Sequence, residues 1–328
     1  MTPGLVSICI PTYNGAKYLT QCLQSAQAQT WADLEILLVD DGSTDDSVAM
    51  AQAHAVGDAR IRVVRNDRNL GLVGNWNRCV DLARGEWIKY LFQDDWLEPD
   101  CVERMLAVAT RPLVFCRRAF SFEGTDADLR RGYERHLDEL SIERVFGQGA
   151  TDISARQMQE AVLRVRYTNI LGEPTACMLH RSVFERFGNF DPRLVQLCDV
   201  EHAFRVGVNT GLSYTSATLA HFRVHGGSTT QVNGLQGNFR KGVIDQLLIL
   251  HAQAVEPAYA ALREEAARQG HDLTQHFIKA RHAEQTCGTF WADSAWDKVV
   301  LQFPYLRMPL ASRLKRSARR AWREIGLR

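Results

Sequence analysis

The sequence lacks the features that mark secreted, membrane-spanning and disulfide-stabilised proteins. Its eight cysteines are scattered, mostly within apolar runs, and none forms a Cys-x-x-Cys pair, which predicts buried thiols in a reducing compartment. No run of about 18 apolar residues occurs, so we expect no membrane-spanning helix. The first residues, Met-Thr-Pro-Gly, lack a basic segment followed by an apolar one, so no secretory signal is expected. These absences predict a cytoplasmic protein.

An excess of charge of either sign is also missing from the chain as a whole. The formal net charge is +1 over 328 residues, of which 45% are hydrophobic and 23% charged, as in an ordinary soluble globular protein. The length predicts one large core with an appended piece. The exception in charge is the segment 307–328, where eight Lys or Arg and one acid give a local charge of +7.

Strands alternate with helices in the first half of the chain. The apolar strand candidates are residues 5–10, 34–39, 61–64 and 87–92. After the first of them, Leu19, Leu23 and Ala26 recur at helical spacing. This alternation predicts an α/β fold, Rossmann-like, with a doubly wound and mostly parallel sheet. No Gly-x-Gly-x-x-Gly follows the first strand, so an NAD-dependent enzyme is not favoured.

Two of these strands end in a pair of adjacent acids. Asp94 and Asp95 follow the strand at 87–92, and Asp41 is the second acid after the strand at 34–39. Adjacent carboxylates repel each other unless a cation or a polyhydroxyl ligand lies between them, and ligands bind at this edge of open α/β sheets. The alternative is a solvated turn in which Asp94 caps a helix starting at Pro99. Ser43 or Thr44 is the expected N-cap of the next helix after Asp41.

Beyond residue 116 the pattern is weaker. Residues 117–151 are charged and poorly periodic, so their shape is not predicted. A helix at 158–165, a strand at 175–179, a strand pair at 213–224 and helices from 237 onward are expected. We therefore divide the chain into a domain at 1–236 and a helical C-terminal region at 237–328.

Five stretches carry a resemblance to a known family. They read VSICIPTYNG, EILLVDDGSTD, ARGEWIKYLFQDD, FGNFD and FRVHGGS, in this order. Together they resemble the inverting nucleotide-sugar glycosyltransferases of the GT-A fold called family 2, over residues 5–230. The last third of the chain is not covered.

The resemblance implies a divalent cation at the second acid pair. Asp95 would bind Mg²⁺ or Mn²⁺, which prefer carboxylate and phosphate oxygens, and Asp94 would contact the ribose or the sugar. A further acid often precedes the pair by two positions in this family, and Phe92 stands there instead, so the metal site is leaner. His225 would complete the metal shell, although a lone histidine in a strand is more often structural.

The resemblance also implies a nucleotide site. Asp41 would accept the imide hydrogen of uracil or thymine, with helix capping as its structural alternative. Tyr13 would lie against the base. The other residues implied to bind the nucleotide are Pro11, Thr12 and Asn14, which would line the base pocket, and Arg223 and Ser228, which would contact diphosphate oxygens.

The catalytic base implied by the resemblance is Asp199. Inversion requires a carboxylate that takes the proton of the attacking acceptor hydroxyl. In the family this group is usually the Asp of a Glu-Asp pair, and Cys198 replaces the Glu here. Glu201 is the rival two positions later; on a helix the two side chains lie about 200° apart, so both can hardly face one acceptor. Capping of the helix is the structural alternative for Asp199.

These motifs predict a metal-dependent, inverting glycosyltransferase that moves a sugar from UDP or dTDP to a glycan or lipid-linked acceptor in surface polysaccharide biosynthesis. The alternative is a non-catalytic nucleotide-binding or scaffolding member of the same fold. No nucleic-acid partner is expected. Apolar residues including Trp322 alternate with arginines at helical spacing in the tail, which predicts either peripheral binding to an anionic membrane surface or a helix packed on the domain.

Overall fold

The N-terminal half of the chain winds back and forth through one sheet, as the sequence predicts. The computed structural model describes residues 2–228, 239–287 and 301–306. The elements up to the central strands are β1 (Thr2–Thr12), α1 (Ala16–Gln27), β2 (Leu34–Asp40), α2 (Ser47–Gly57), β3 (Ile61–Arg65), α3 (Gly71–Leu82), β4 (Gly85–Tyr90), β5 (Trp96–Leu97) and α4 (Cys101–Ala107).

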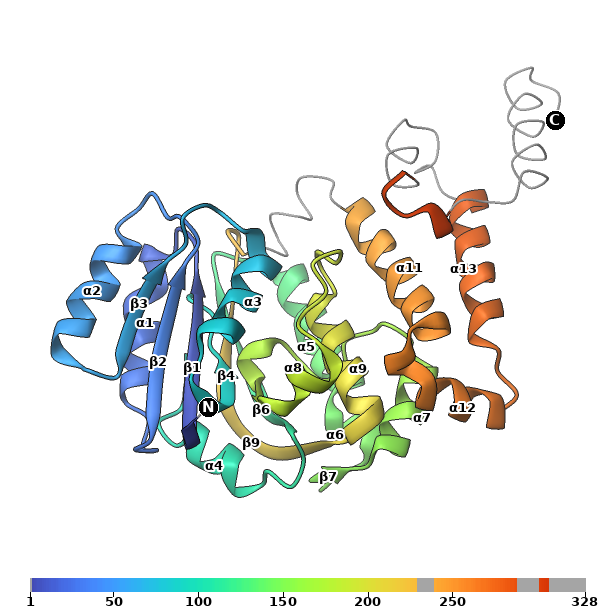
Figure 1. The fold of residues 1–328 in the computed structure, drawn as a ribbon, viewed down its shortest axis with the longest axis horizontal. Coiled ribbons are helices and arrows are strands. Elements are labelled where there is room, and N and C mark those ends of the chain that lie inside the picture. Colours follow the sequence, from blue (N-terminus) through green and yellow to red (C-terminus); the bar gives the residue numbers. More distant parts are fainter. Residues whose placement is uncertain (1, 229–238, 288–300, 307–328) are drawn as a thin grey trace, which may run out of the picture.

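The second half adds further strands and a helical end (Figure 1). Its elements are β6 (Leu113–Glu123), α5 (Ala127–Leu140), α6 (Ile142–Phe146), β7 (Asp152–Ile153), α7 (Ala155–Val165), η1 (Pro174–Ala176), β8 (Cys177–His180), α8 (Ser182–Phe187), α9 (Cys198–Thr210), β9 (Leu212–His225), α11 (Phe239–Val255), η2 (Pro257–Tyr259), α12 (Ala260–Arg268), α13 (Leu273–Cys287) and η4 (Pro304–Leu306).

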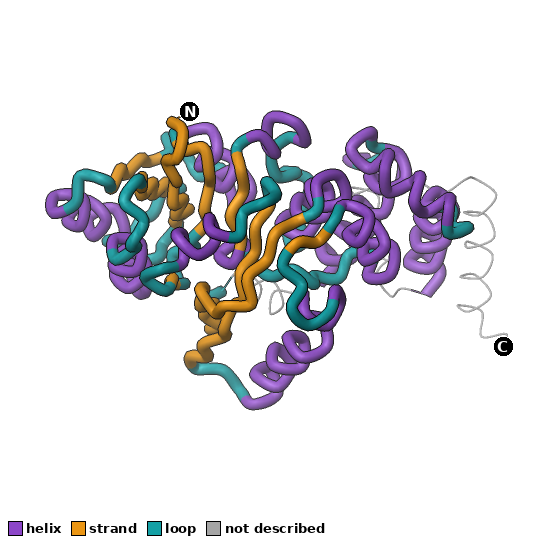
Figure 2. The backbone as a smooth tube through the Cα atoms, turned by 90° about the horizontal axis from the view of Figure 1, so that it is seen from below, coloured by secondary structure: helices purple, strands orange, loops and turns teal. Residues whose placement is uncertain are grey.

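In the part of the chain that the structure describes, nine strands form one sheet of order β3-β2-β1-β4-β8-β6-β9-β5, with β7 paired to β9. The pairs β3–β2, β2–β1, β1–β4 and β6–β9 are parallel, and β8 runs antiparallel between β4 and β6. All seven residues of β2 are buried, as expected for a parallel strand covered on both faces. Figure 2 shows helices on both sides of the strands. The predicted α/β architecture is confirmed.

The helices cover the sheet with the faces that their periodicity predicts. On α1 the buried residues are Leu19, Cys22, Leu23 and Ala26. The seven cysteines whose side chains are described are free and buried, which agrees with the prediction of reduced thiols. Within the described residues, no helix is long and apolar enough to cross a membrane.

Two local predictions and one alternative interpretation are wrong. Helix α2 begins at Ser47 after the N-cap residue Asp46, so neither Ser43 nor Thr44 caps it; the Ser43 hydroxyl instead accepts the N–H of Asn14 at 2.9 Å. Helix α4 follows Asp100, so Asp94 is not its cap.

The third concerns the predicted strand pair at 213–224, which is one strand, β9, of 14 residues. The strand β9 is long because it pairs with β6 over almost the whole length of both strands. Strand β6 itself extends into residues 117–151, the segment whose shape the sequence did not predict. The rest of that stretch includes α5 and α6.

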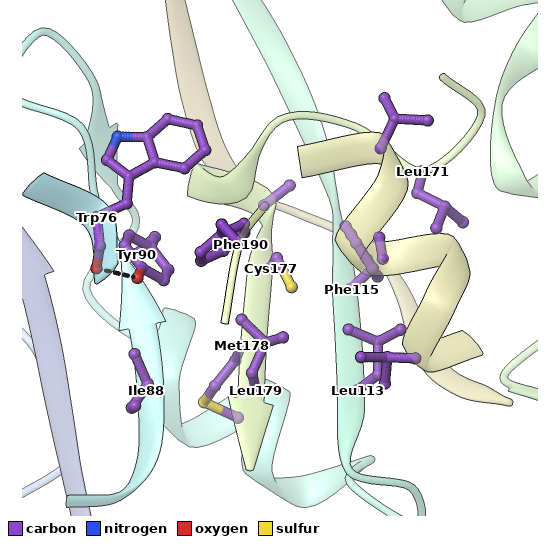
Figure 3. Close-up of a cluster of buried hydrophobic side chains, with 14 of the residues drawn as sticks. Trp76, Ile88, Tyr90, Leu113, Phe115, Leu171, Cys177, Met178, Leu179 and Phe190 are labelled. Atoms are coloured by element: carbon purple, nitrogen blue, oxygen red, sulfur yellow. Dashed lines mark hydrogen bonds between the residues drawn. The ribbon is translucent and has the colours of Figure 1, made fainter. Parts of the chain in front are cut away.

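The core continues from the sheet into the C-terminal helices. Figure 3 shows Phe115 of β6 and Met178 of β8 among the apolar side chains packed between the sheet and the helices. Tyr90 is fully buried and donates its hydroxyl hydrogen to the carbonyl oxygen of Trp76 at 2.9 Å. Helices α11 and α13 lie side by side (Figure 1), and α12 packs on α7 and α9. The C-terminal helices therefore support α9, which carries Asp199.

Candidate active site

The loops that follow β1 and β4 are joined by a reciprocal pair of hydrogen bonds. The Tyr13 N–H donates to Gln93 Oε1 at 2.9 Å, and Gln93 Nε2 donates to the Tyr13 carbonyl at 3.2 Å. A Cβ at Gly15 would lie 2.2 Å from Gln93 Oε1, so a side chain there would displace Gln93 from this pairing. The Tyr13 side chain remains 50% exposed, which leaves its ring accessible to a ligand.

The loop after β2 is tied to the same place. Asn14, at a positive φ of 47°, accepts the Thr44 N–H on its side-chain oxygen at 2.8 Å. Thr12 is buried, and its hydroxyl donates to the Ile10 carbonyl at 3.2 Å. The structure thus brings the predicted base-pocket residues, Pro11 to Asn14, against the loop that contains Asp41.

Asp41 is buried and caps a helix, but not the one that the sequence suggested. Its carboxylate accepts the N–H groups of Leu70 at 2.8 Å and Gly71 at 2.9 Å, at the start of α3. It also accepts Asn66 Nδ2 at 2.9 Å. A carboxylate has about four acceptor positions, so one remains for a ligand, and base recognition by Asp41 stays a prediction.

His225 lies against Asp94 rather than Asp95. The distance from His225 Nε2 to Asp94 Oδ2 is 2.9 Å. The Gly227 N–H donates to His225 Nδ1 at 3.2 Å, so the proton of the neutral ring belongs on Nε2, where it is donated to Asp94. The Tyr18 ring packs on the imidazole with centroids 4.7 Å apart. The end of β9 therefore presents an imidazole to the first acid of the pair.

Asp95 points into the protein. It is 1% exposed and accepts hydrogen bonds from the Thr175 hydroxyl at 2.5 Å and from the Arg223 N–H at 2.9 Å. Burial raises the pKa of its carboxyl well above the usual range, and the charge of Asp94 raises it further. Asp95 thereby fixes the loop before β5 to β9 and to the turn before β8.

Arg223 and Ser228 are held by the protein itself. The Arg223 guanidinium donates to the Asp94 carbonyl at 2.9 Å and to Gln21 Oε1 at 2.5 Å, and lies 3.3 Å from Glu123. The Ser228 N–H closes a turn by donating to the His225 carbonyl at 3.1 Å. Contact of Arg223 with a diphosphate would require exchange of these partners.

Asp199 lies in the first turn of α9, where its Oδ1 accepts the Val200 N–H at 2.8 Å. Desolvation raises the pKa of its carboxyl to about 7; the charge of Glu173 raises this pKa and that of Arg118 lowers it. The N-cap residue of α9 is Leu197, so Asp199 is not the helix cap. A carboxylate that titrates near neutral pH suits general base catalysis.

Glu201 is occupied elsewhere. It is 2% exposed, and its two oxygens accept Arg205 Nε and Nη2 at 2.9 and 3.0 Å. The hydroxyl of Tyr259, from η2, donates to the same carboxylate at 3.0 Å. Glu201 thus joins α9 to the C-terminal region, which leaves Asp199 as the carboxylate available to a substrate.

Three supporting residues were not identified from the sequence. Thr175 bonds Asp95, and Glu173 lies within electrostatic reach of both Asp95 and Asp199. Asp245 of α11 accepts the N–H groups of residues 195–197 on one oxygen, at 2.9, 2.6 and 3.0 Å. No local signal points to them, because each acts on a segment distant in sequence.

The residues present fit a lean cation site. Among the described residues, no group of three or more His, Cys, Asp or Glu is arranged to hold a metal ion. Asp94 and His225 nevertheless lie side by side, both partly exposed, and a cation would take the place of the proton that His225 Nε2 donates to Asp94. Mg²⁺ and related cations usually keep several waters and use one or two protein carboxylates together with substrate phosphates.

Comparison with known proteins agrees with this geometry. The sequence model of glycosyl transferase family 2 matches residues 7–188. The chain belongs to this family. It is 32% identical over 237 residues to EpsH of Bacillus subtilis (strain 168), named as a putative glycosyltransferase, a match that covers 70% of this chain and 63% of EpsH. A chondroitin synthase of Escherichia coli is 46% identical over 102 residues, which cover 31% of this chain and 15% of that enzyme.

Solved structures of glycosyltransferases share the fold. The S. aureus TarS fragment 1–349 in complex with UDP-GlcNAc aligns with a TM-score of 0.60 at 16% identity, covering 87% of this chain and 76% of that one. The mannosyltransferase PcManGT from Pyrobaculum calidifontis, in complex with GDP-Man and Mn²⁺, gives 0.55 at 15% identity, covering 94% and 82%. This family 2 glycosyltransferase therefore has the GT-A fold with a helical C-terminal part.

Proposed function

We propose that this glycosyltransferase transfers a sugar, with inversion and with help from a divalent cation, from a UDP- or dTDP-sugar to a hydroxyl of a glycan or lipid-linked acceptor in surface polysaccharide synthesis. The observation that carries the proposal is Asp199, a carboxylate with a pKa of about 7 that has no ion pair among the described residues. The relative EpsH and the chondroitin synthase support the reaction class. The TarS complex supports a nucleotide-sugar donor.

Asp199 would act on the acceptor side. Above pH 7 it is mainly ionised and can accept the hydrogen of the acceptor hydroxyl as that oxygen attacks the anomeric carbon. The leaving nucleotide would depart toward the loops that contain Tyr13, Asp41 and Asp94. Tyr13 would stack on the base, and Asp41 would use its remaining acceptor position for an imide N–H.

We assign the protein ligands of Mg²⁺ or Mn²⁺ to Asp94 and His225. This differs from the assignment that the family resemblance implies, because Asp95 is buried and bonded to Thr175 and to the Arg223 backbone. When bound, the cation would offset the negative charge of the diphosphate. Asp95 would instead keep Asp94 in place.

The test is UDP release. The purified chain, incubated with UDP-sugars and Mn²⁺, should release UDP slowly without an acceptor and faster with one. If no donor of a full panel gave UDP release, the result would favour the non-catalytic, scaffolding alternative. In a thermal-shift screen, a nucleotide at 100 times its Kd should stabilise the fold by about 2.7 kcal/mol. UDP or dTDP should give a larger shift than GDP, and the reverse order would contradict the role of Asp41.

The membrane prediction concerns a basic segment, residues 307–328, that lies outside the described residues. We propose that this tail binds an anionic membrane surface from the cytoplasmic side, since each basic residue near anionic lipid contributes about 1 kcal/mol. Deletion of residues 309–328 should abolish sedimentation with anionic liposomes and leave UDP binding intact. Unchanged sedimentation would contradict the proposal that the tail binds the membrane.

A further inference from the structure

A cavity of about 340 Å³ lies between β6, the helices α5 and α6, and the start of β9. Its polar lining includes Arg117 and Arg118 of β6, Glu134 of α5, Glu143 of α6 and Tyr214 of β9. This volume is at the lower end of the range for small-molecule sites, which suits one sugar unit. No residue of the predicted donor site lines the cavity.

The cavity is lined by a residue within electrostatic reach of the proposed base. Arg118, which lines it, is 8% exposed and forms an ion pair with Glu173. Both of these charges act on Asp199. Leu171, two residues before Glu173, also lines the cavity. A saccharide held there would therefore contact Arg118, whose charge reaches the carboxylate that we propose to activate the acceptor hydroxyl.

The pairing of β6 with β9 is irregular where two arginines reach the cavity. Successive side chains of a strand normally point to opposite faces, yet Cys116, Arg117 and Arg118 all line this cavity. The pairing of β6 with β9 shifts register on both sides of Arg117, and the extra residues lie on β9, because Cys116 pairs with Thr215 and Arg118 with Ala220. Such bulges re-aim side chains and are frequent next to active sites.

Among the described residues, the charges of the lining leave one cation, Arg117, and one anion, Glu143, without a charged partner. Glu173 neutralises Arg118, the Tyr214 hydroxyl donates to Glu143 at 2.5 Å, and Glu134 pairs with Arg130 of its own helix at 3.3 Å. Arg117 is exposed, and no carboxylate of the described residues lies within ion-pair distance of it. The cavity thus combines a guanidinium that has no counter-ion in the described part of the chain with carboxylate oxygens; these groups recognise an anionic substituent and hydroxyls respectively.

We propose that this cavity binds an anionic sugar unit of the acceptor, with Arg117 contacting its carboxylate or phosphate. The assignment rests on the proposed function, because it names the acceptor class that Asp199 would serve. A carboxylate and a phosphate would use the same guanidinium contact, so the probes must separate them.

The experiment measures binding of three small glycosides to the full chain by saturation-transfer NMR titration. The probes are methyl glucuronide, glucose 6-phosphate and the neutral methyl glucoside. We expect at least one anionic probe to bind about tenfold more tightly than the glucoside, because a charge-assisted hydrogen bond is worth roughly a factor of ten. Preference for the glucuronide identifies a carboxylate, and preference for the sugar phosphate identifies a phosphate.

Arg117→Ala should remove this preference and Arg117→Lys should restore part of it. Arg131→Ala, which removes an equal charge from the exposed face of α5, is the matched control and should leave binding unchanged. Equal binding of neutral and anionic probes, or a preference that survives Arg117→Ala, would overturn the proposal. Wild-type enzyme that releases UDP but binds no anionic probe refutes the subsite alone. Wild-type enzyme that binds the probe but never releases UDP refutes the proposed function alone.

Discussion

Replacement of Asp199 by asparagine should lower activity and raise stability at the same time. The side chain keeps its shape and its Oδ1 can still accept the Val200 N–H, but it can no longer take a proton. Loss of a general base lowers a rate by about 10²- to 10⁴-fold. UDP affinity should stay nearly unchanged, because we place Asp199 on the acceptor side of the site.

The gain in stability follows from the pKa. Desolvation raises the pKa of Asp199 from 3.8 to about 7 on folding, so the folded state disfavours the ionised carboxylate. The free energy of unfolding is therefore reduced progressively as the pH rises from 3.8, and the reduction levels off above pH 7. A pKa difference of one corresponds to about 1.4 kcal/mol, so the reduction is roughly 2 kcal/mol at pH 5 and roughly 4 kcal/mol at pH 8. The asparagine variant has no carboxyl group at this position, so its free energy of unfolding is not reduced in this way at either pH.

Urea unfolding of both proteins at pH 5 and pH 8 measures the effect, and the advantage of Asp199→Asn should be about twice as large at pH 8. The wild-type kcat should also fall about tenfold per pH unit below pH 7. A variant that keeps near-normal transfer would show that Asp199 is not the base. A variant whose stability advantage is the same at both pH values would show that the carboxyl has an ordinary pKa.

Three further substitutions test other parts of the site. Glu201→Gln leaves Arg205 buried without its counter-ion, so it should lower the free energy of unfolding by about 3 kcal/mol while the folded fraction retains its transfer rate; full inactivity with normal stability would make Glu201 the base instead. Asp245→Ala leaves three N–H groups before α9 without an acceptor. It should lower kcat about ten- to hundredfold with unchanged UDP affinity. Asp245→Asn keeps an acceptor oxygen, so it should lower kcat less. Gly15→Ala should weaken UDP binding in titration calorimetry because its Cβ meets a side chain at 2.2 Å, whereas Gly57→Ala, which meets nothing within 4 Å, should not.

The first half of the fold was predictable because its strands are buried on both faces. An apolar run such as residues 34–39, followed by apolar residues at helical spacing, indicates a strand of a parallel sheet covered on both faces. Strand β2 is indeed buried along its whole length. The excursion at 117–151 was not predictable. There β6 pairs with β9, which lies about 100 residues later in the sequence. The spacing of apolar residues within a segment does not indicate such a distant partner.

The site shows the same division. The residues from Pro11 to Asn14 and Asp41 come together because adjacent parallel strands end at one edge, which the sequence predicts. The partner of His225 could not be predicted, since Asp94 and Asp95 are equivalent in a sequence pattern. Their difference arises where β5 pairs with β9 and turns one carboxylate toward Thr175 and the other toward the imidazole.

Charge balance supports the proposed cation, although no large cluster of ligands exists among the described residues. The charges of Asp94 and Glu173 both raise the pKa of Asp95, so the three carboxyl groups lie within electrostatic reach of one another. The nearby guanidinium groups are already paired, Arg118 with Glu173 and Arg223 with Glu123. A nucleotide diphosphate would add two negative charges beside these carboxylates, and repulsion at such distances costs several kcal/mol in a partly buried site. A divalent cation held by Asp94 and His225 would offset that repulsion, so donor binding should depend on the metal more strongly than binding of the uncharged nucleoside does.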